Sequence, residues 1–186
     1  PKYYSMKITI LSWGSLIWDP LNLQIDTNQG SNGWLPNGPI LPIEFARISR
    51  DSRLTLVIVP NEVNKIQTLY AFSKFQNLDE AILDLAVREG CGRSKIGYYD
   101  KKMKKFSDNF LIKKFQDQRS EIEKWSNNKV IDAVIWTNLP SNFRDRLDLN
   151  EFTPMDAINY LNHLPPDVKV KAEEYIRKAP KIVDTP

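Results

Sequence analysis

The chain has 186 residues, of which 41% are hydrophobic and 11% aromatic, and its formal net charge is +3. This composition excludes a disordered chain, and no apolar run approaches the roughly 20 residues that cross a bilayer. So small a net charge gives no reason to expect nucleic acid as a partner. We therefore expect a single globular domain over residues 1–186 that binds neither membrane nor nucleic acid.

The cysteine and histidine content limits both the cellular compartment and the chemistry. Cys91 is the only cysteine and His163 the only histidine. An intramolecular disulfide and a metal site built from several Cys or His ligands are therefore excluded. A reducing, cytoplasmic location and a reaction without a metal fit this content.

The first element in chain order is a predicted β-strand from Met6 to Trp13, rich in β-branched and aromatic residues. It stops at Gly14, where the chain can bend sharply and a ligand can approach the backbone, and Ser15 adds a hydroxyl and another N–H. Successive N–H groups around one concavity can hold a carboxylate or a phosphate. The pattern fits either such an anion site or a simple tight turn at a sheet edge.

A long loop is predicted over residues 21–38, because Asn, Gly and Pro are dense there. Loops of this length in a compact domain usually cover or shape a site, and this one begins close to the Gly14 turn. Trp34 within it is either a lid or an anchor.

Two strands over residues 40–49 and 54–59 then predict a β-hairpin. Glu44 and Arg47 are expected on opposite faces of the first strand, because their separation is odd, unless a bulge intervenes. Arg47 is either a surface residue or a cation that faces an anion site.

A helix from about Asp79 to Glu89 is predicted next, with Asn77 or Asp79 as its N-cap and Gly90 as its C-cap. Glu89 falls at the edge of the apolar stripe of this helix. A carboxylate is unfavourable at a helix C-terminus, and local conflicts of this kind are expected at functional sites. The alternative is a solvated residue of the last turn.

The remaining chain is predicted to continue with short strands and helices. The expected elements are strands over 68–72, 96–99 and 130–136, a helix from Ser107 or Asp108 to about Trp125, a loop over 138–146, and helices over 153–162 and 166–178. The strand over 130–136 is apolar throughout, which is typical of a central strand. Residues from about 139 to 186 form a helical C-terminal extension, and the lysines crowded over 101–114 form either a solvated face or a site for an anionic partner.

Three segments resemble one known family. The string Trp13-Gly14-Ser15-Leu16-Ile17-Trp18, followed by Asp19-Pro20, resembles the N-terminal loop of the γ-glutamyl cyclotransferase-like superfamily, above all its ChaC-type members with Tyr-Gly-Ser-Leu-Ile-Trp-x-Pro. Arg88-Glu89-Gly90 resembles the end of the helix that carries the general acid/base glutamate of this family, and Arg47 matches its Arg-bearing strand. The resemblance covers roughly the first half of the chain. Trp13 stands where the family usually has Tyr, and an indole can only donate a hydrogen bond.

The resemblance implies a mixed α+β fold with a small, partly closed β-barrel wrapped by helices. It implies a metal-independent and cofactor-free reaction in which the α-amine of a γ-glutamyl peptide or amine attacks its own γ-carbonyl and releases 5-oxoproline. In this interpretation Glu89 is the general acid/base. The small anionic substrate is bound by Trp13, Gly14, Ser15, Leu16 and Arg47, with backbone N–H groups of the turn holding the α-carboxylate or the oxyanion.

A second class of function is also open, because a fold does not prescribe chemistry. The same domain could bind a small anion without turnover, or bind a partner through its lysine-rich face. Glu89 discriminates between these alternatives. A side chain in a cavity beside Gly14 and Ser15 supports catalysis, and a side chain paired on the surface supports binding.

Overall fold

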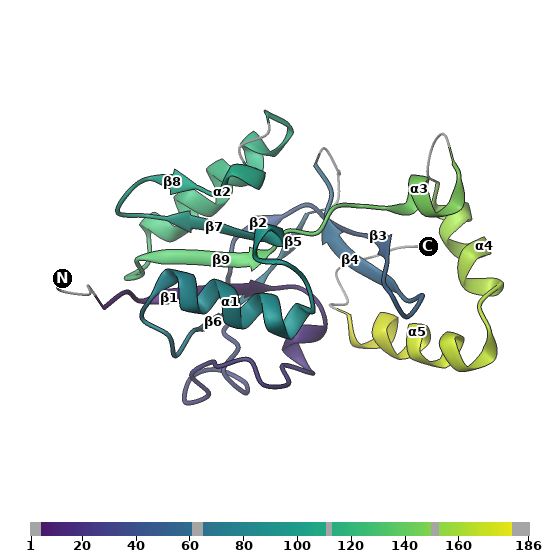
Figure 1. Ribbon diagram of the computed structural model, residues 1–186, viewed down its shortest axis with the longest axis horizontal. Coiled ribbons are helices and arrows are strands. Elements are labelled where there is room, and N and C mark those ends of the chain that lie inside the picture. Colours follow the sequence, from purple (N-terminus) through teal and green to yellow (C-terminus); the bar gives the residue numbers. More distant parts are fainter. Residues whose placement is uncertain (1–4, 61–64, 111–112, 150–152, 180–186) are drawn as a thin grey trace.

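The computed structural model describes residues 5–60, 65–110, 113–149 and 153–179 as a mixed α+β protein. Its largest unit is a five-stranded sheet (Figure 1). The strands in spatial order are β6 (Leu69–Phe72), β1 (Ile8–Ser12), β9 (Ala133–Thr137), β7 (Ile96–Asp100) and β8 (Lys105–Phe106). β1 and β9 are parallel and the other neighbours are antiparallel. The apolar segment that ends in β9 therefore occupies the centre of the sheet, as expected.

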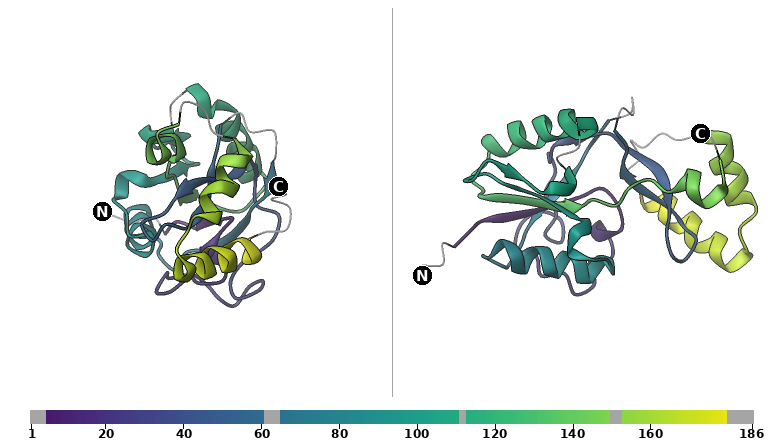
Figure 2. Two further views of the ribbon diagram at one scale, coloured as in Figure 1. Left: turned by 90° about the vertical axis from the view of Figure 1, so that its right-hand side faces the viewer. Right: turned by 45° about the horizontal axis from the view of Figure 1, so that its top comes forward.

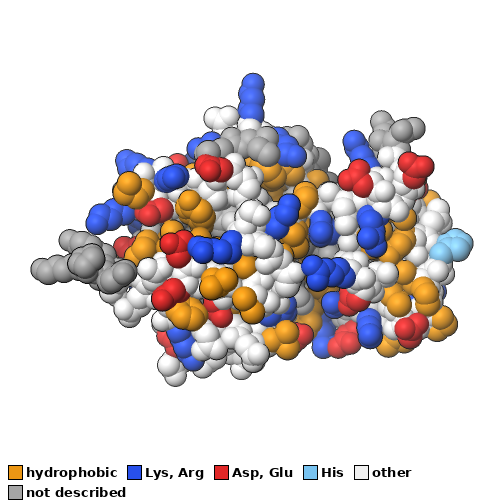
Figure 3. All heavy atoms as spheres, viewed as in Figure 1, with side chains coloured by type: hydrophobic (Ala, Val, Ile, Leu, Met, Phe, Trp, Pro, Cys, Tyr) orange, Lys and Arg blue, Asp and Glu red, His pale blue; other side chains and the backbone are white. Residues whose placement is uncertain are grey.

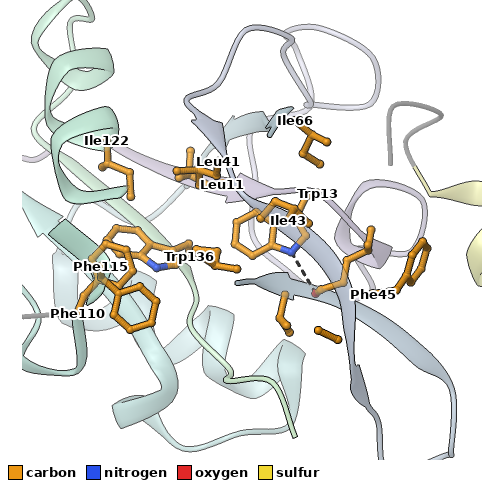
Figure 4. Packing of buried hydrophobic residues seen from close by; sticks show 14 of the residues in the cluster. Leu11, Trp13, Leu41, Ile43, Phe45, Ile66, Phe110, Phe115, Ile122 and Trp136 are labelled. Carbon is orange, nitrogen blue, oxygen red and sulfur yellow. Dashed lines mark hydrogen bonds between the residues drawn. The ribbon is translucent and has the colours of Figure 1, made fainter. Parts of the chain in front are cut away.

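Alternation along β1 divides the core into two clusters. Ile8 and Ile10 belong to a cluster with α1 (Leu78–Glu89), whereas Leu11 and Trp13 belong to a larger cluster on the opposite face. α2 (Gln116–Asn127) covers that opposite face, so the sheet lies between two helices (Figure 2). In the larger cluster the aromatic rings of Phe110, Phe115 and Trp136 pack together (Figure 4); the first two lie 4.7 Å apart between ring centroids.

Trp34 of the long loop is an anchor and not a lid. Its side chain is 2% exposed and lies in the cluster beneath α1. The segment around it makes isolated backbone bridges, including one between Leu35 and Tyr70 of β6. The loop is thus fixed to the edge of the sheet.

The predicted hairpin is present as β3 (Ile43–Ile48) and β4 (Leu54–Ile58), and a second pair joins β2 (Ile40–Leu41) to β5 (Ile66–Gln67). The register of β3 shifts between Phe45 and Arg47, so a bulge interrupts the alternation. Glu44 and Arg47 are both half-buried between fully buried neighbours, which places them on one face. The bulge that the sequence analysis named as the exception is therefore present, and the opposite faces of an ideal strand do not apply here.

The described strands do not form a closed barrel. They form one five-stranded and two two-stranded sheets. The described residues also contain no helix that is both long enough and apolar enough to span a bilayer.

Three helices surround the hairpin at the end remote from β8 (Figure 1): α3 (Phe143–Leu147), α4 (Pro154–Asn162) and α5 (Pro166–Lys178). α4 and α5 match the predicted helices, and Thr153 caps α4 with a capping box. α3 lies where a loop was expected. Its first residue, Phe143, is fully buried, and that burial stabilises one helical turn in a polar segment.

Two further boundaries differ from expectation. The helix expected from residue 107 or 108 begins at Gln116 and follows one-turn 3₁₀ helices at Asp108–Phe110 and Lys113–Phe115. Phe110 and Phe115 are buried in the core, and tertiary packing of these rings takes precedence over the helical period. The central strand begins at Ala133, and Val130 before it is 86% exposed.

Candidate functional site

A pocket of about 540 Å³ opens where the carboxyl ends of the parallel strands β1 and β9 meet the hairpin. Its walls come from the turn after β1, from the hairpin of β3 and β4, from the end of α1, from the end of β9 and the residues after it, and from α5. In open sheets of this kind the carboxyl ends of parallel strands are the usual place for a ligand. The topology therefore brings five distant segments of the chain to one site.

All the residues that the sequence singled out as candidate site residues line this pocket. They are Trp13, Gly14, Ser15, Leu16, Arg47 and Glu89. They come from the turn after β1, from the bulged strand β3 and from the last residue of α1. Gly90 adopts the left-handed conformation with φ 60°, ends α1 directly after Glu89, and also lines the pocket.

Glu89 is largely withdrawn from water, with 17% of its side chain exposed. Burial raises the pKa of this carboxyl, and the neighbouring Arg88 guanidinium, 3.3 Å away, and the Thr137 hydroxyl lower it in part. Burial is the largest of these effects, so Glu89 holds a proton to higher pH than a surface glutamate. A carboxyl whose pKa is raised in this way suits proton transfer.

Arg88 connects the end of α1 to the Gly14 turn. Its Nε donates to the backbone oxygen of Asp19 at 3.1 Å, and its Nη1 faces Glu89. The turn is a one-turn 3₁₀ helix over Ser15–Ile17, closed by the Ile17 N–H on the Gly14 oxygen at 3.0 Å. By contacting both, Arg88 fixes the position of Glu89 relative to the Gly14 turn.

Trp13 contributes an apolar wall. Its indole N–H donates to the backbone oxygen of Leu56 in β4 at 3.2 Å (Figure 4). An indole has no second donor, so this contact uses its hydrogen-bonding capacity. Trp13 therefore braces β4 against the end of β1.

Tyr175 is a pocket residue that the sequence reasoning missed. It lies on α5, its side chain is 6% exposed, and its hydroxyl accepts the Leu56 N–H at 3.4 Å. Burial raises the pKa of Tyr175 to about 12. Only the three-residue spacing from the buried Ala172 marks Tyr175 in the sequence, and that spacing indicates packing and not a site.

The pocket is rich in cations. Its lining contains five basic side chains (Arg47, Arg50, Arg53, Arg88 and Lys95) and two carboxylates (Asp51 and Glu89). Arg53 pairs with Asp51 at 2.8 Å and Arg88 with Glu89. Arg47 and Arg50 donate instead to the backbone oxygens of Pro140 and Gly90, which carry no charge to cancel theirs. An anionic ligand is therefore favoured in the pocket.

Cys91 also lines the pocket but is poorly suited to act as a nucleophile. Burial raises the pKa of its thiol, and the nearby Glu89 carboxylate raises it further. The reactive form of cysteine is the thiolate, which this surrounding disfavours. Within the described ranges, no three His, Cys, Asp or Glu side chains are grouped so that they could hold a metal ion.

The fold and the pocket define a class: a mixed α+β protein with a cationic pocket that contains a buried carboxyl beside a Gly-Ser turn. A scan against protein-family models finds no matching family, and searches of curated proteins and of solved structures find no similar chain. The function therefore has to be inferred from the pocket and from the sequence resemblance.

Proposed function

We propose that this protein is a γ-glutamyl cyclotransferase-like enzyme that releases 5-oxoproline from a γ-glutamyl peptide or amine. One observation carries the proposal: the buried carboxyl of Glu89 lines the same pocket as the Gly14-Ser15 turn. These two features come from the two segments with the most specific family resemblance, and 73 residues of chain lie between Ser15 and Glu89.

The reaction needs little from the protein beyond positioning, one proton acceptor and a site for negative charge. The α-amine of the substrate attacks the γ-carbonyl of the same molecule, so the substrate supplies its own nucleophile. Glu89 takes a proton from the attacking nitrogen and returns it to the leaving nitrogen. The turn at Gly14, Ser15 and Leu16, together with Arg47 of the same pocket lining, binds the anionic part of the substrate.

The arrangement of the sheets supports the partly closed barrel that the resemblance implies. Thr68 alone separates β5 from β6, and Pro42 alone separates β2 from β3. Strand pairing therefore passes from the five-stranded sheet through the β2–β5 pair to the hairpin. On this proposal the three sheets correspond to one curved barrel wall, and the single cysteine, Cys91, is in keeping with a cytoplasmic enzyme.

The test is release of 5-oxoproline from glutathione, γ-glutamyl amino acids and γ-glutamyl amines. We expect turnover by the wild type and a decrease in kcat of about 100-fold or more for Glu89→Gln, because general acid/base catalysis is lost. Glu80→Gln is the matched control, since Glu80 lies exposed in the first turn of the same helix. Wild-type activity in Glu89→Gln would eliminate Glu89 as the base.

Binding of a small anion without turnover is the second candidate function, and the excess of cations in the pocket is the observation that favours it. Calorimetry with 5-oxoproline and with glutathione discriminates between the two. Binding by a wild type that turns over no γ-glutamyl compound supports this second function.

A further inference from the structure

Tyr175 is a buried phenol that reaches the pocket from the C-terminal extension, outside the part of the chain that resembles the family. Its ring packs edge-on against Trp18 and Phe45, with centroids 5.4 and 6.4 Å away, and the Arg53 guanidinium lies 5.6 Å from its centre. These contacts fix the ring, so its hydroxyl has a defined position in the wall.

The hydrogen bonds of the hydroxyl determine where its proton can point. The Leu56 N–H donates to Tyr175 Oη at 3.4 Å, and the Ser15 N–H interacts with the same oxygen. A phenol oxygen accepts through its lone pairs and carries one hydrogen. Backbone donors cannot accept this hydrogen, so the hydroxyl is available to donate to a ligand in the pocket that Tyr175 and Glu89 both line.

The Gly14 turn is shaped around this phenol. A Cβ on residue 14 would lie 2.6 Å from Tyr175 Oη, closer than real Cβ contacts, so any other residue at this position would force the hydroxyl to shift. The turn therefore presents a phenol O–H to a ligand beside Ser15. Because Tyr175 has a pKa of about 12, it stays protonated and remains a donor at neutral pH.

We propose that Tyr175 is a catalytic residue of the proposed cyclotransferase, whose O–H donates a hydrogen bond to the γ-carbonyl oxygen of the substrate as that oxygen becomes an oxyanion. When the amine nitrogen bonds to the γ-carbon, the carbonyl π electrons move to this oxygen and Glu89 takes a proton from the nitrogen. The electron pair then re-forms the carbonyl, the bond to the leaving nitrogen breaks, and that nitrogen receives the proton from Glu89. Tyr175 keeps its proton throughout. This inference rests on the proposed function.

The experiment compares Tyr175→Phe with Tyr160→Phe in the full chain. Tyr160 is a matched control because it lies on the neighbouring α4 and its hydroxyl donates to the Ser52 oxygen at 2.8 Å, outside the pocket lining. We expect kcat for 5-oxoproline release to fall about 100-fold in Tyr175→Phe, the loss typical of one oxyanion donor, with KM nearly unchanged. Tyr160→Phe should retain the wild-type kcat.

A second variant covers the case in which Tyr175→Phe does not fold. Gly14→Ala keeps the phenol but displaces its hydroxyl, and should reduce kcat with KM nearly unchanged, whereas damage to substrate binding by the turn would raise KM. Wild-type kcat in folded Tyr175→Phe, or a rise in KM alone, would overturn the role of Tyr175 and leave the proposed function standing. Where Tyr175→Phe is unfolded, wild-type kcat in Gly14→Ala would overturn it. A wild type that releases no 5-oxoproline would overturn both proposals.

Discussion

Glu89 couples the stability of the protein to pH, whatever reaction the pocket performs. Burial raises the pKa of its carboxyl above 4.5, the ordinary value, so the unfolded chain ionises at lower pH than the folded one. The stability associated with this group is complete below the unfolded pKa and is lost as pH rises through the folded pKa. Glu89→Gln should therefore gain stability relative to the wild type as pH rises, by about 1.4 kcal/mol per unit of pKa shift.

Urea unfolding at a series of pH values between about 4 and 8 measures this difference. Loss of the contact with Arg88 lowers the stability of the variant by a roughly constant amount at every pH above the pKa. This offset opposes the gain but does not reverse the trend with pH. Glu80→Gln should show no such growing difference, because Glu80 is exposed. A stability difference that shrinks with rising pH would show that Glu89 is not protonated more readily in the folded state.

At the residue scale, the sequence predicted the pocket residues that have a local sequence signal and missed those that reach the pocket only through folding. Gly14 follows the end of a strand and Glu89 lies at the end of a helix, and these boundaries can be recognised in the sequence. Tyr175, Arg53 and Lys95 reach the pocket only through tertiary folding. Their local sequence is that of an ordinary helix, turn or loop, so no short pattern identifies them.

Among the elements, one side chain next to the start of α3 bonds twice to the outer edge of β3. The Asn142 amide donates to the Ile48 oxygen at 2.9 Å, and the Ile48 N–H donates to Asn142 Oδ1 at 2.8 Å. The Asn142 side chain thus satisfies the two backbone groups of Ile48 that a neighbouring strand would otherwise bond. Asn142→Ala should destabilise the protein by about 1–3 kcal/mol, because both backbone groups of Ile48 lose their partner.

Urea unfolding again gives the measurement, and Asn128→Ala is the control. Asn128 makes a comparable amide bond to the Lys124 oxygen at 3.2 Å, but it is exposed at the end of α2. Its loss should cost less than about 0.5 kcal/mol, as is usual for surface positions. Equal effects of the two substitutions would show that the Asn142 contact does not hold α3 to the hairpin.

The helices and strands were predictable where local signals and burial agree. Asn77 caps α1 through the N–H groups of Asp79 and Glu80, and Pro154 begins α4 after a Thr cap, so both helices were expected near their observed bounds. α3 and the start of α2 were not, because their form depends on burial of aromatic rings against distant elements. The bulge in β3 likewise cannot be predicted by assuming that side chains alternate strictly between the two faces of a strand.

Over the whole molecule the formal net charge is only +3, yet positive charge is concentrated in the pocket lining. On the face shown in Figure 3, Lys and Arg side chains gather over the middle of the molecule and toward the C-terminal helices. Such a field attracts anions, and salt screens it over a distance that falls from about 30 Å at 0.01 M to about 3 Å at 1 M.

On the proposed function, the expected consequence is a salt-dependent kcat/KM for an anionic γ-glutamyl peptide, with a decrease of about tenfold between low and high salt and little change in kcat. Lys95→Met should flatten this dependence, because Lys95 is an exposed cation of the pocket lining. Lys105→Met removes an exposed lysine of β8, outside that lining, and should leave the dependence as in the wild type. Identical salt dependence in the wild type and Lys95→Met would show that the charge of Lys95 does not draw the substrate in, and would assign binding to short-range contacts alone.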